Sequence, residues 1–266
     1  MMNSGVVDRQ HVSVGAHEHP AYAHLPLLVG QDRQKLSKRH GDVALEDYRD
    51  KGYLPEGLRN YLALLGWGPP DGREILPIDD VVAQFRLEDV TKAAAFFDHQ
   101  KLDHVNGEYI RALPAGTFVR ESLPWLEEDS PWPPERFDLP TFEAIAPLVQ
   151  ERVKTLAEVP AMVDFLFLEE PVVDERSWDK AMKPPADKVL EDAIAEYSEC
   201  AWETQVLHDV TLAVGERHGL KLAKAQAPVR VAVTGRSVGP PLFESLHVLG
   251  RDRTLARLRA ARQRLG

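Results

Sequence analysis

Three cations and one hydroxyl occur within residues 35–39 of this chain, which read Lys-Leu-Ser-Lys-Arg. Lysine ammonium groups act as mobile point charges, and arginine adds a planar fork that matches phosphate oxygens. The group follows a short apolar run at residues 23–30. On a loop, such a cluster can close on the phosphates of a nucleotide and stabilise the negative charge that grows in a transition state. The spacing therefore predicts a phosphate-binding loop.

Two basic stripes stand against an acidic background. The 266 residues carry 32 Lys and Arg against 42 Asp and Glu, a formal net charge of −10. That total does not favour nucleic acid at long range, although a local basic stripe on an acidic body can still bind it. One stripe is the loop at residues 33–39. The second suits either phosphate contacts or a solvated helix end. It consists of Arg251, Arg253, Arg257, Arg259, Arg262 and Arg264.

Composition argues against several kinds of site. Cys200 is the only cysteine, so an intrachain disulfide is impossible and a thiolate zinc site is implausible. His11, His17, His19 and His24 lie close together, but no patterned carboxylate supports them, and we expect a solvated tail and no metal. There is no run long enough to span a membrane, no signal peptide, no Walker A pattern and no G-x-G-x-x-G.

A predicted strand at residues 23–29 leads the chain into the basic loop, and we expect it to lack neighbouring strands. Helices dominate from residue 44 onward. Pro55 suits a first helical turn, after which Leu58, Tyr61, Leu62 and Leu65 share an apolar face. The predicted helices cover residues 45–49, 55–65, 79–85, 90–96, 102–110, 141–157, 187–201, 206–218, 242–249 and 252–265.

Prolines predict where the helices break, and tryptophans are candidates for stacking on bases. Residues 115–140 are rich in proline and acid, which favours short helices or a hinge, and Pro147 is expected to kink or split the helix at 141–157. The pair Pro184-Pro185 indicates a linker-like break. Four tryptophans offer either stacking surfaces for bases or core packing. They are Trp125, Trp132, Trp178 and Trp202.

Three blocks carry a family resemblance. They read GDVALEDYRDKGYLPEGLRNYLALLGWGPP at residues 41–70, FDHQKLDHVNGEYIRALP at 97–114 and VAVTGRSVGPPLFESLHVLG at 231–250. In order and spacing they resemble the C-terminal half of a bacterial glutamyl-tRNA synthetase, over roughly residues 20 to 266. Residues 35–39 resemble the KMSKS loop of class I aminoacyl-tRNA synthetases. The family's H-x-G-H motif, which begins its nucleotide-binding part, does not occur in the 266 residues.

The resemblance implies a mainly α fold. A small remnant of a class I α/β catalytic domain, with the signature loop, would lie with an unmatched tail in residues 1–43. A helical stem-contact domain would follow at 44–114. An all-α anticodon-binding region would occupy 115–266, with a split near 184. Within the predicted stem-contact domain, four residues are expected to pack in the core: Phe96, Phe97, Leu102 and Ile110.

The resemblance also assigns roles to residues. Lys35 and Lys38 would be catalytic, neutralising charge that develops on the α-phosphate of ATP, within an incomplete site. Ser37 and Arg39 would complete the ATP-binding loop. In the anticodon region, Arg230 and Arg236 are candidates for tRNA phosphate contacts, although the glycine- and proline-rich block around Arg236 favours a structural role. ATP and Mg²⁺ would serve the full-length family, with neither bound within this chain alone.

We therefore predict a cytoplasmic ligase fragment of protein biosynthesis that recognises tRNA(Glu). Alone it would bind tRNA without attaching glutamate, and a separate chain carrying the nucleotide-binding half would supply the rest of the catalytic site. Two alternatives stay open: a non-catalytic tRNA-binding regulator, and a gene remnant without function. Whether tRNA(Gln) is also accepted depends on anticodon contacts that the sequence does not locate.

Overall fold

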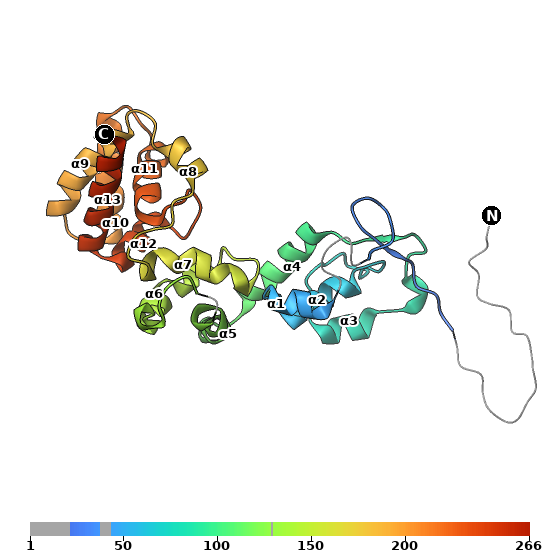
Figure 1. Ribbon diagram of the computed structural model, residues 1–266. Coiled ribbons are helices and arrows are strands. Elements are labelled where there is room, and N and C mark those ends of the chain that lie inside the picture. The colour runs from blue at the N-terminus through green and yellow to red at the C-terminus, as the bar shows by residue number, and fades with distance from the viewer. Residues whose placement is uncertain (1–21, 38–43, 129) are drawn as a thin grey trace, which may run out of the picture. The chain divides into compact units, whose positions relative to one another are not determined.

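The computed structural model describes residues 22–37, 44–128 and 130–266, and over these ranges the chain is mainly helical, as predicted (Figure 1). It divides into unit 1, residues 1–109, and unit 2, residues 110–266. The predicted domain boundaries near residues 43, 114 and 184 stay predictions. The elements of unit 1 are β1 (Leu28–Val29), α1 (Leu45–Asp50), α2 (Pro55–Ala63), α3 (Ile78–Gln84), β2 (Ala95–Phe96) and most of α4 (His99–Ala112).

An aromatic core holds unit 1 together. Tyr61 of α2 is 1% exposed and packs edge-on against Phe97, with 5.1 Å between the ring centroids. The Tyr61 hydroxyl accepts a hydrogen bond of 2.6 Å from the backbone amide of Asp98, and burial raises the pKa of Tyr61 to about 12. Leu58 is buried as the predicted apolar face requires, whereas Leu62 of the same face is 41% exposed.

The two strands of unit 1 form a parallel pair. Leu28 lies opposite Ala95, and Val29 lies opposite Phe96. The strand predicted at 23–29 is thus only two residues long, and it has the neighbour that we expected it to lack. The helix predicted at 90–96 is wrong, because β2 lies there. Its alanines favour a helix locally, but pairing with a distant segment decides the conformation.

Strand geometry also corrects one core residue. Successive side chains of a strand point to opposite faces. Ala95 and Phe97 are buried, so Phe96 between them points away and is 47% exposed. The predicted burial of Leu102 and Ile110 is confirmed.

A close approach of α2 to α4 provides a test of unit 1. The Asn106 side chain is fully buried, and its Oδ1 accepts a hydrogen bond of 2.8 Å from the amide of Leu54, just before α2. A Cβ at Gly57 would lie 2.6 Å from that oxygen. We expect Gly57→Ala to displace Asn106 and lower the free energy of unfolding by about 2 kcal/mol, measured by urea denaturation. In the matched variant Gly116→Ala, whose Cβ meets nothing within 4 Å, a gain of about 0.5–1 kcal/mol is expected. Equal effects of the two changes would contradict this account.

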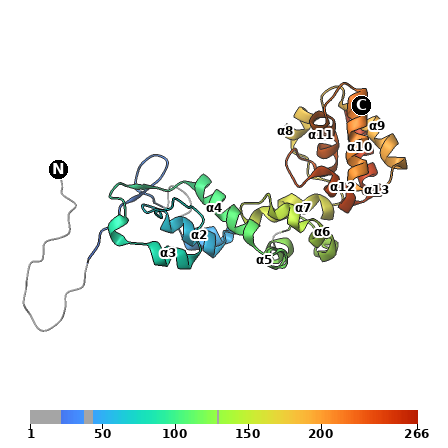
Figure 2. The same ribbon diagram turned by 180° about the vertical axis from the view of Figure 1, so that it is seen from behind.

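Unit 2 contains two groups of packed helices, which both views show (Figures 1 and 2). Helices α5, α6 and α7 pack on one another, and the later helices form a second bundle in which α9 packs on α13 and α10 on α11. The elements are α5 (Ala115–Glu127), α6 (Leu139–Gln150), α7 (Val159–Phe167), α8 (Glu175–Ala181), α9 (Ala186–Glu199), α10 (Thr204–Arg217), α11 (Leu222–Thr234), α12 (Leu242–Leu249) and α13 (Arg251–Leu265).

Prolines interrupt unit 2 less than predicted. Residues 115–127 form one helix with Pro124 inside it, where we expected short helices or a hinge. Pro147 lies within α6, which ends three residues later, so the predicted helix at 141–157 stops early. Pro184-Pro185 lies between α8 and α9. The amphipathic pattern of α9 is confirmed, with Leu190 and Tyr197 fully buried.

Arginines of the last helix cap an earlier one. Arg253 donates hydrogen bonds of 2.6 and 2.7 Å to the carbonyls of Leu166 and Leu168, and Arg257 donates to those of Leu168 and Glu169 at 2.8 and 3.1 Å. These carbonyls end α7, where a helix leaves its acceptors unsatisfied. Neither interpretation of the C-terminal stripe, phosphate contacts or a solvated helix end, anticipated this internal role.

Two further arginines of the stripe also bond within the unit. Arg251 lies 5.5 Å from the ring centre of Trp202, and Arg264 lies 3.9 Å from that of Trp178. Arg264 also pairs with Glu175, with its Nη2 2.8 Å from the nearer carboxylate oxygen. The stripe therefore contributes more to packing than its composition suggests.

Candidate nucleic-acid interface

The basic loop begins as a tight turn fixed by β1. The amide of Gly30 donates to the carbonyl of Gln34 at 3.0 Å, and Lys35 forms an antiparallel bridge with Val29. Arg33 takes the left-handed conformation, with φ of 59°. A non-glycine residue in this conformation is uncommon, so the surrounding bonds hold the turn in place. The turn directs the chain back along β1 toward residues 36 and 37.

Only part of the predicted ATP-binding set can be located. Lys35 is exposed, so its ammonium can meet a phosphate, and Ser37 is half-buried. Lys38 and Arg39 lie outside the described residues. The catalytic role of Lys35 and Lys38 stays a prediction.

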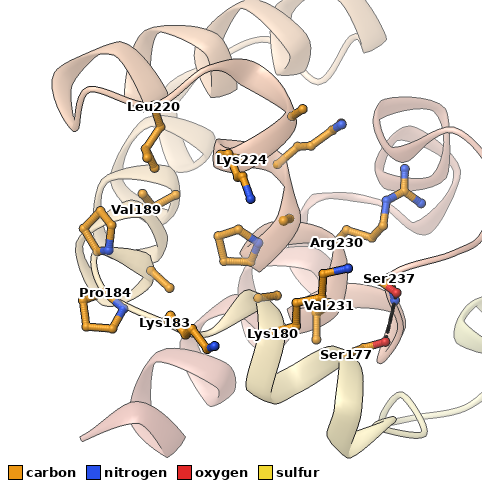
Figure 3. Close-up of a pocket in the computed structure, with 17 residues that line it drawn as sticks. Ser177, Lys180, Lys183, Pro184, Val189, Leu220, Lys224, Arg230, Val231 and Ser237 are labelled. Atoms are coloured by element: carbon orange, nitrogen blue, oxygen red, sulfur yellow. Dashed lines mark hydrogen bonds between the residues drawn. The ribbon is translucent and has the colours of Figure 1, made fainter.

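A basic cavity of about 520 Å³ lies in unit 2, between α8, α11 and the start of α9 (Figure 3). Lys183 and Lys224 reach it from opposite sides. Its lining includes four cations and no acid among the described residues. The polar side chains are Ser177, Lys180, Lys183, Lys224, Gln226, Arg230 and Ser237.

The lining itself carries no carboxylate among the described residues, while two acids bear on it from behind: Asp174 accepts a hydrogen bond of 2.6 Å from Ser177, and Glu244 acts on Arg230. Arg230 donates a hydrogen bond of 2.7 Å to the carbonyl of Pro240, and burial followed by the nearby Arg152 lowers the pKa of its guanidinium. Lys180, Lys183 and Arg152 are exposed. Such a group can hold phosphates of a flexible nucleic-acid strand, with the hydroxyl of Ser237 and the amide of Gln226 as further donors.

The second predicted tRNA contact, Arg236, faces into the unit. Its Nη2 donates to the carboxylate of Asp164 at 2.5 Å, and its Nη1 donates to the carbonyl of Ala161. Asp164 is 5% exposed, and its burial raises the pKa of the carboxyl while Arg236 opposes the rise. This placement favours the structural role for Arg236, and the predicted tRNA contact stays a prediction.

Sequence reasoning found one lining cation, Arg230, and missed Lys180, Lys183, Lys224 and the nearby Arg152. These residues are scattered along the chain, and each alone resembles an ordinary surface cation. Packing of α8 beside α11 brings Lys180 and Lys224 to one cavity, and Lys183 lies just after α8.

The tryptophans do not line the cavity. Trp132 is 3% exposed and packs on Phe167, with 5.0 Å between ring centroids. Trp202 donates its indole N–H to the carbonyl of Leu246 at 3.1 Å. Packing therefore accounts for both of these.

Two other kinds of site are absent from the described residues. Among those residues, no helix combines the length and apolar character needed to cross a membrane. In the same ranges, no three histidine, cysteine or acidic side chains gather as a metal would require. Of the four clustered histidines, His24 is exposed, while His11, His17 and His19 fall outside these ranges.

Two family models match the chain. Residues 117–262 match the anticodon binding domain, and residues 12–104 match the catalytic domain of class I tRNA synthetases (E and Q). The first match contains every residue of the basic cavity. The second contains the basic loop.

Relatives and solved structures match over most of this chain. The glutamate–tRNA ligase of Salinispora arenicola is 55% identical in an alignment that covers 92% of this chain and 54% of the ligase. The glutamate–tRNA ligase of Thermobifida fusca is 56% identical in an alignment that covers 92% of this chain and 52% of the ligase. The crystal structure of a glutamate tRNA ligase from Elizabethkingia meningosepticum, in complex with its amino acid, covers 94% of the chain and 52% of its own, with 25% identity and a TM-score of 0.72. The chain thus spans about half the length of the curated relatives it matches.

Proposed function

Because the chain belongs to the anticodon-binding-domain family and corresponds to the C-terminal part of glutamate–tRNA ligases, we propose that unit 2 binds tRNA(Glu) in translation. The basic cavity would take part of the anticodon arm, with Lys180, Lys183, Lys224 and Arg230 at its phosphates. Arg152 would extend this contact surface. A cytoplasmic location follows from this role.

One observation carries the proposal: within the region that matches the anticodon-binding family, four cations line one cavity without an acid among the described residues. The chain as a whole is acidic, at −10. Long-range attraction is therefore weak, and affinity must come from such a local concentration of cations. The hydroxyl of Ser237 adds a neutral donor, which suits sugar and base edges, whereas the hydroxyl of Ser177 already donates to the carboxylate of Asp174.

The loop in unit 1 belongs to the inherited reaction, the ATP-dependent attachment of glutamate to tRNA. Lys35 and Lys38 would meet the phosphates of ATP, with Ser37 and Arg39 supporting the loop. Lys35 fits this task as an exposed ammonium on a fixed turn. ATP with Mg²⁺ would supply the adenylyl group that activates the glutamate carboxylate, with pyrophosphate as the leaving group. Among the described residues no cluster of acidic or histidine side chains could hold the ion by itself.

A second chain carrying the H-x-G-H motif would complete the catalytic site. The 266 residues contain no such motif. Beside β1 and β2, Leu25, Leu27 and Phe96 are 67%, 58% and 47% exposed, an apolar surface that a neighbouring domain can cover. We therefore propose that the 266-residue chain, without that second chain, binds tRNA but does not activate glutamate.

Binding of the purified chain to tRNA(Glu) and to an unrelated tRNA, across a salt series, tests the proposal. We expect selective binding whose logarithmic affinity falls with a slope of about −3 to −4 against log salt, as four phosphate contacts require. ATP–PPi exchange on the same sample is expected to be absent. ATP–PPi exchange that requires glutamate and is lost in Lys38→Ala would contradict the proposal that the chain alone does not activate glutamate. Equal affinity for tRNA(Glu) and the unrelated tRNA would contradict specific recognition of tRNA(Glu). The absence of both tRNA binding and ATP–PPi exchange would favour the alternative that the chain is a gene remnant without function.

A further inference from the structure

One face of the small sheet in unit 1 is apolar and exposed. Val29 of β1 lies opposite Phe96 of β2, so these two side chains share a face of the sheet. Leu27 and Leu25 precede Val29 by two and four residues, and Pro26 favours an extended conformation of Leu25, so the alternation of a strand directs both leucines to that face. Leu25, Leu27 and Phe96 are 67%, 58% and 47% exposed. The described residues therefore leave this sheet face uncovered.

The segment that leads into this sheet has unpaired backbone groups. Residues 22–27 belong to no helix or strand. Within the described ranges, the segment makes one backbone hydrogen bond, in which the carbonyl of Leu27 accepts from the amide of Ala95 at 2.9 Å. The amides of Ala23, His24 and Leu25 donate to no backbone carbonyl in those ranges. An exposed backbone of this kind, beside an apolar face, is a template for pairing with another strand.

The surface formed by residues 22–30 and 93–97 carries no formal charge that would repel a second copy of the chain. The whole chain has a net charge of −10, so two copies repel each other at long range. These two segments, however, contain no aspartate, glutamate, lysine or arginine, and His24 is their only side chain that can ionise near neutral pH. Local repulsion therefore does not oppose self-association there, whereas a nucleic acid would find no lysine or arginine to hold its phosphates.

We propose that two copies of this chain associate through this surface, with residues 22–25 of one copy paired antiparallel with the same residues of the other. Antiparallel pairing of a segment with itself is symmetric about a two-fold axis, so the contact closes as a dimer and does not propagate. It would satisfy the unpaired amides and bury Leu25 of both copies.

The dimer would exclude another partner. The second chain proposed above to complete the catalytic site would cover the same apolar surface, so the dimer is the state of the chain without that partner. This exclusion rests on the proposed function, whereas the dimer itself does not.

Sedimentation equilibrium of the full chain without nucleic acid tests the dimer. Because the surface is small, we expect a dissociation constant on the order of 10–100 µM. Between about 1 and 200 µM chain, a range chosen to bracket that constant, the average mass is expected to rise from the 29.8 kDa of one chain toward twice that value. Leu25→Lys brings two like charges together across the two-fold axis and is expected to weaken the dimer at least about tenfold. Leu45→Lys is the matched control: Leu45 of α1 is also 67% exposed but lies outside the surface, and its variant is expected to keep the dimer.

Hydrogen exchange gives a second measurement, which is specific to the backbone pairing. The amides of Ala23, His24 and Leu25 are expected to exchange more slowly at the highest concentration than at the lowest, because only the dimer gives them acceptors. A doubled mass without this protection would contradict the antiparallel pairing.

Other outcomes would overturn the dimer or its location. A mass that stays at 29.8 kDa throughout would overturn the dimer. A dimer that survives Leu25→Lys, or is lost equally in Leu45→Lys, would overturn its location. Loss in Val82→Lys alone would move the contact to α3, where Val82 is 72% exposed. If circular dichroism shows that Leu25→Lys does not fold, Leu27→Lys on the same face replaces it. Because no tRNA is present, failure of the proposed tRNA binding would leave every one of these outcomes unchanged.

Discussion

The double variant Lys183→Glu/Lys224→Glu is expected to bind tRNA(Glu) about 100-fold more weakly than the unmodified chain near physiological salt. Both lysines line the basic cavity from opposite sides, so their reversal replaces two attractive charges with two repulsive ones at the same phosphates. Because two phosphate contacts disappear, the slope of log affinity against log salt is expected to decrease in magnitude by about 2. Fluorescence anisotropy with labelled tRNA measures both quantities.

The matched control is Arg120→Glu/Arg259→Glu, which makes the same change in net charge at two exposed positions outside the cavity. We expect its affinity to fall only slightly, since solvent and salt screen charges away from the contact. A comparable loss in the control would mean that net charge alone governs binding. Full affinity in the lysine variant would remove the cavity from the tRNA interface.

Arg236→Ala is expected to lower the free energy of unfolding of unit 2 by about 3–5 kcal/mol, because it leaves the buried carboxylate of Asp164 without its partner. Urea denaturation followed by circular dichroism measures the change, with the two units fitted as separate transitions. Asp164→Asn/Arg236→Ala is expected to recover part of the loss, since a neutral amide is easier to bury than an unpaired charge. Failure to recover would mean that the bond of Arg236 to the carbonyl of Ala161 carries the effect.

The Arg236→Ala effect has a defined pH dependence. The pKa of Asp164 is raised by burial, and loss of Arg236 raises it further, because the arginine opposes the rise. The folded variant then keeps a proton that the unfolded chain releases near its ordinary pKa of 3.8. Its stability is therefore greatest below that pH and falls as the pH rises through the raised value. Arg217→Ala, at a surface pair with Glu196, is the control and is expected to change stability little at any pH.

Local patterns predicted the helices well and the long-range contacts poorly. Pro55 and the spacing of Leu58 and Tyr61 place α2, and Gly250 separates α12 from α13, since these signals lie within the element itself. β2 was missed because its conformation depends on Leu28 and Val29, far away in the sequence. A strand of two residues is too short to show the alternation of apolar and polar residues from which a strand is predicted.

In the candidate site, too, residues that are close in the sequence were predicted, and residues that only packing brings together were missed. The basic loop is a contiguous motif, so its residues can be read directly, and Arg230 came from the resemblance of its neighbourhood to a known family. Lys180, Lys183 and Lys224 are separate surface lysines until two helices bring them together. The C-terminal arginines show the converse: their sequence suggests an exposed stripe, yet the carbonyls of Leu166 and Leu168 engage Arg253 inside the unit.

The parallel pairing of β1 with β2 also bears on the order in which unit 1 folds. The ladder is two residues long, and α1, α2 and α3 lie between its strands in the sequence. Closing so long a loop costs entropy that two pairs of residues cannot repay alone, so the helices must first bring Ala95 into position. Contacts formed so late contribute little to the folding nucleus and act mainly to slow unfolding. We therefore expect the turn that carries Lys35 to be among the last parts of unit 1 to form, on a core that it does not help to nucleate.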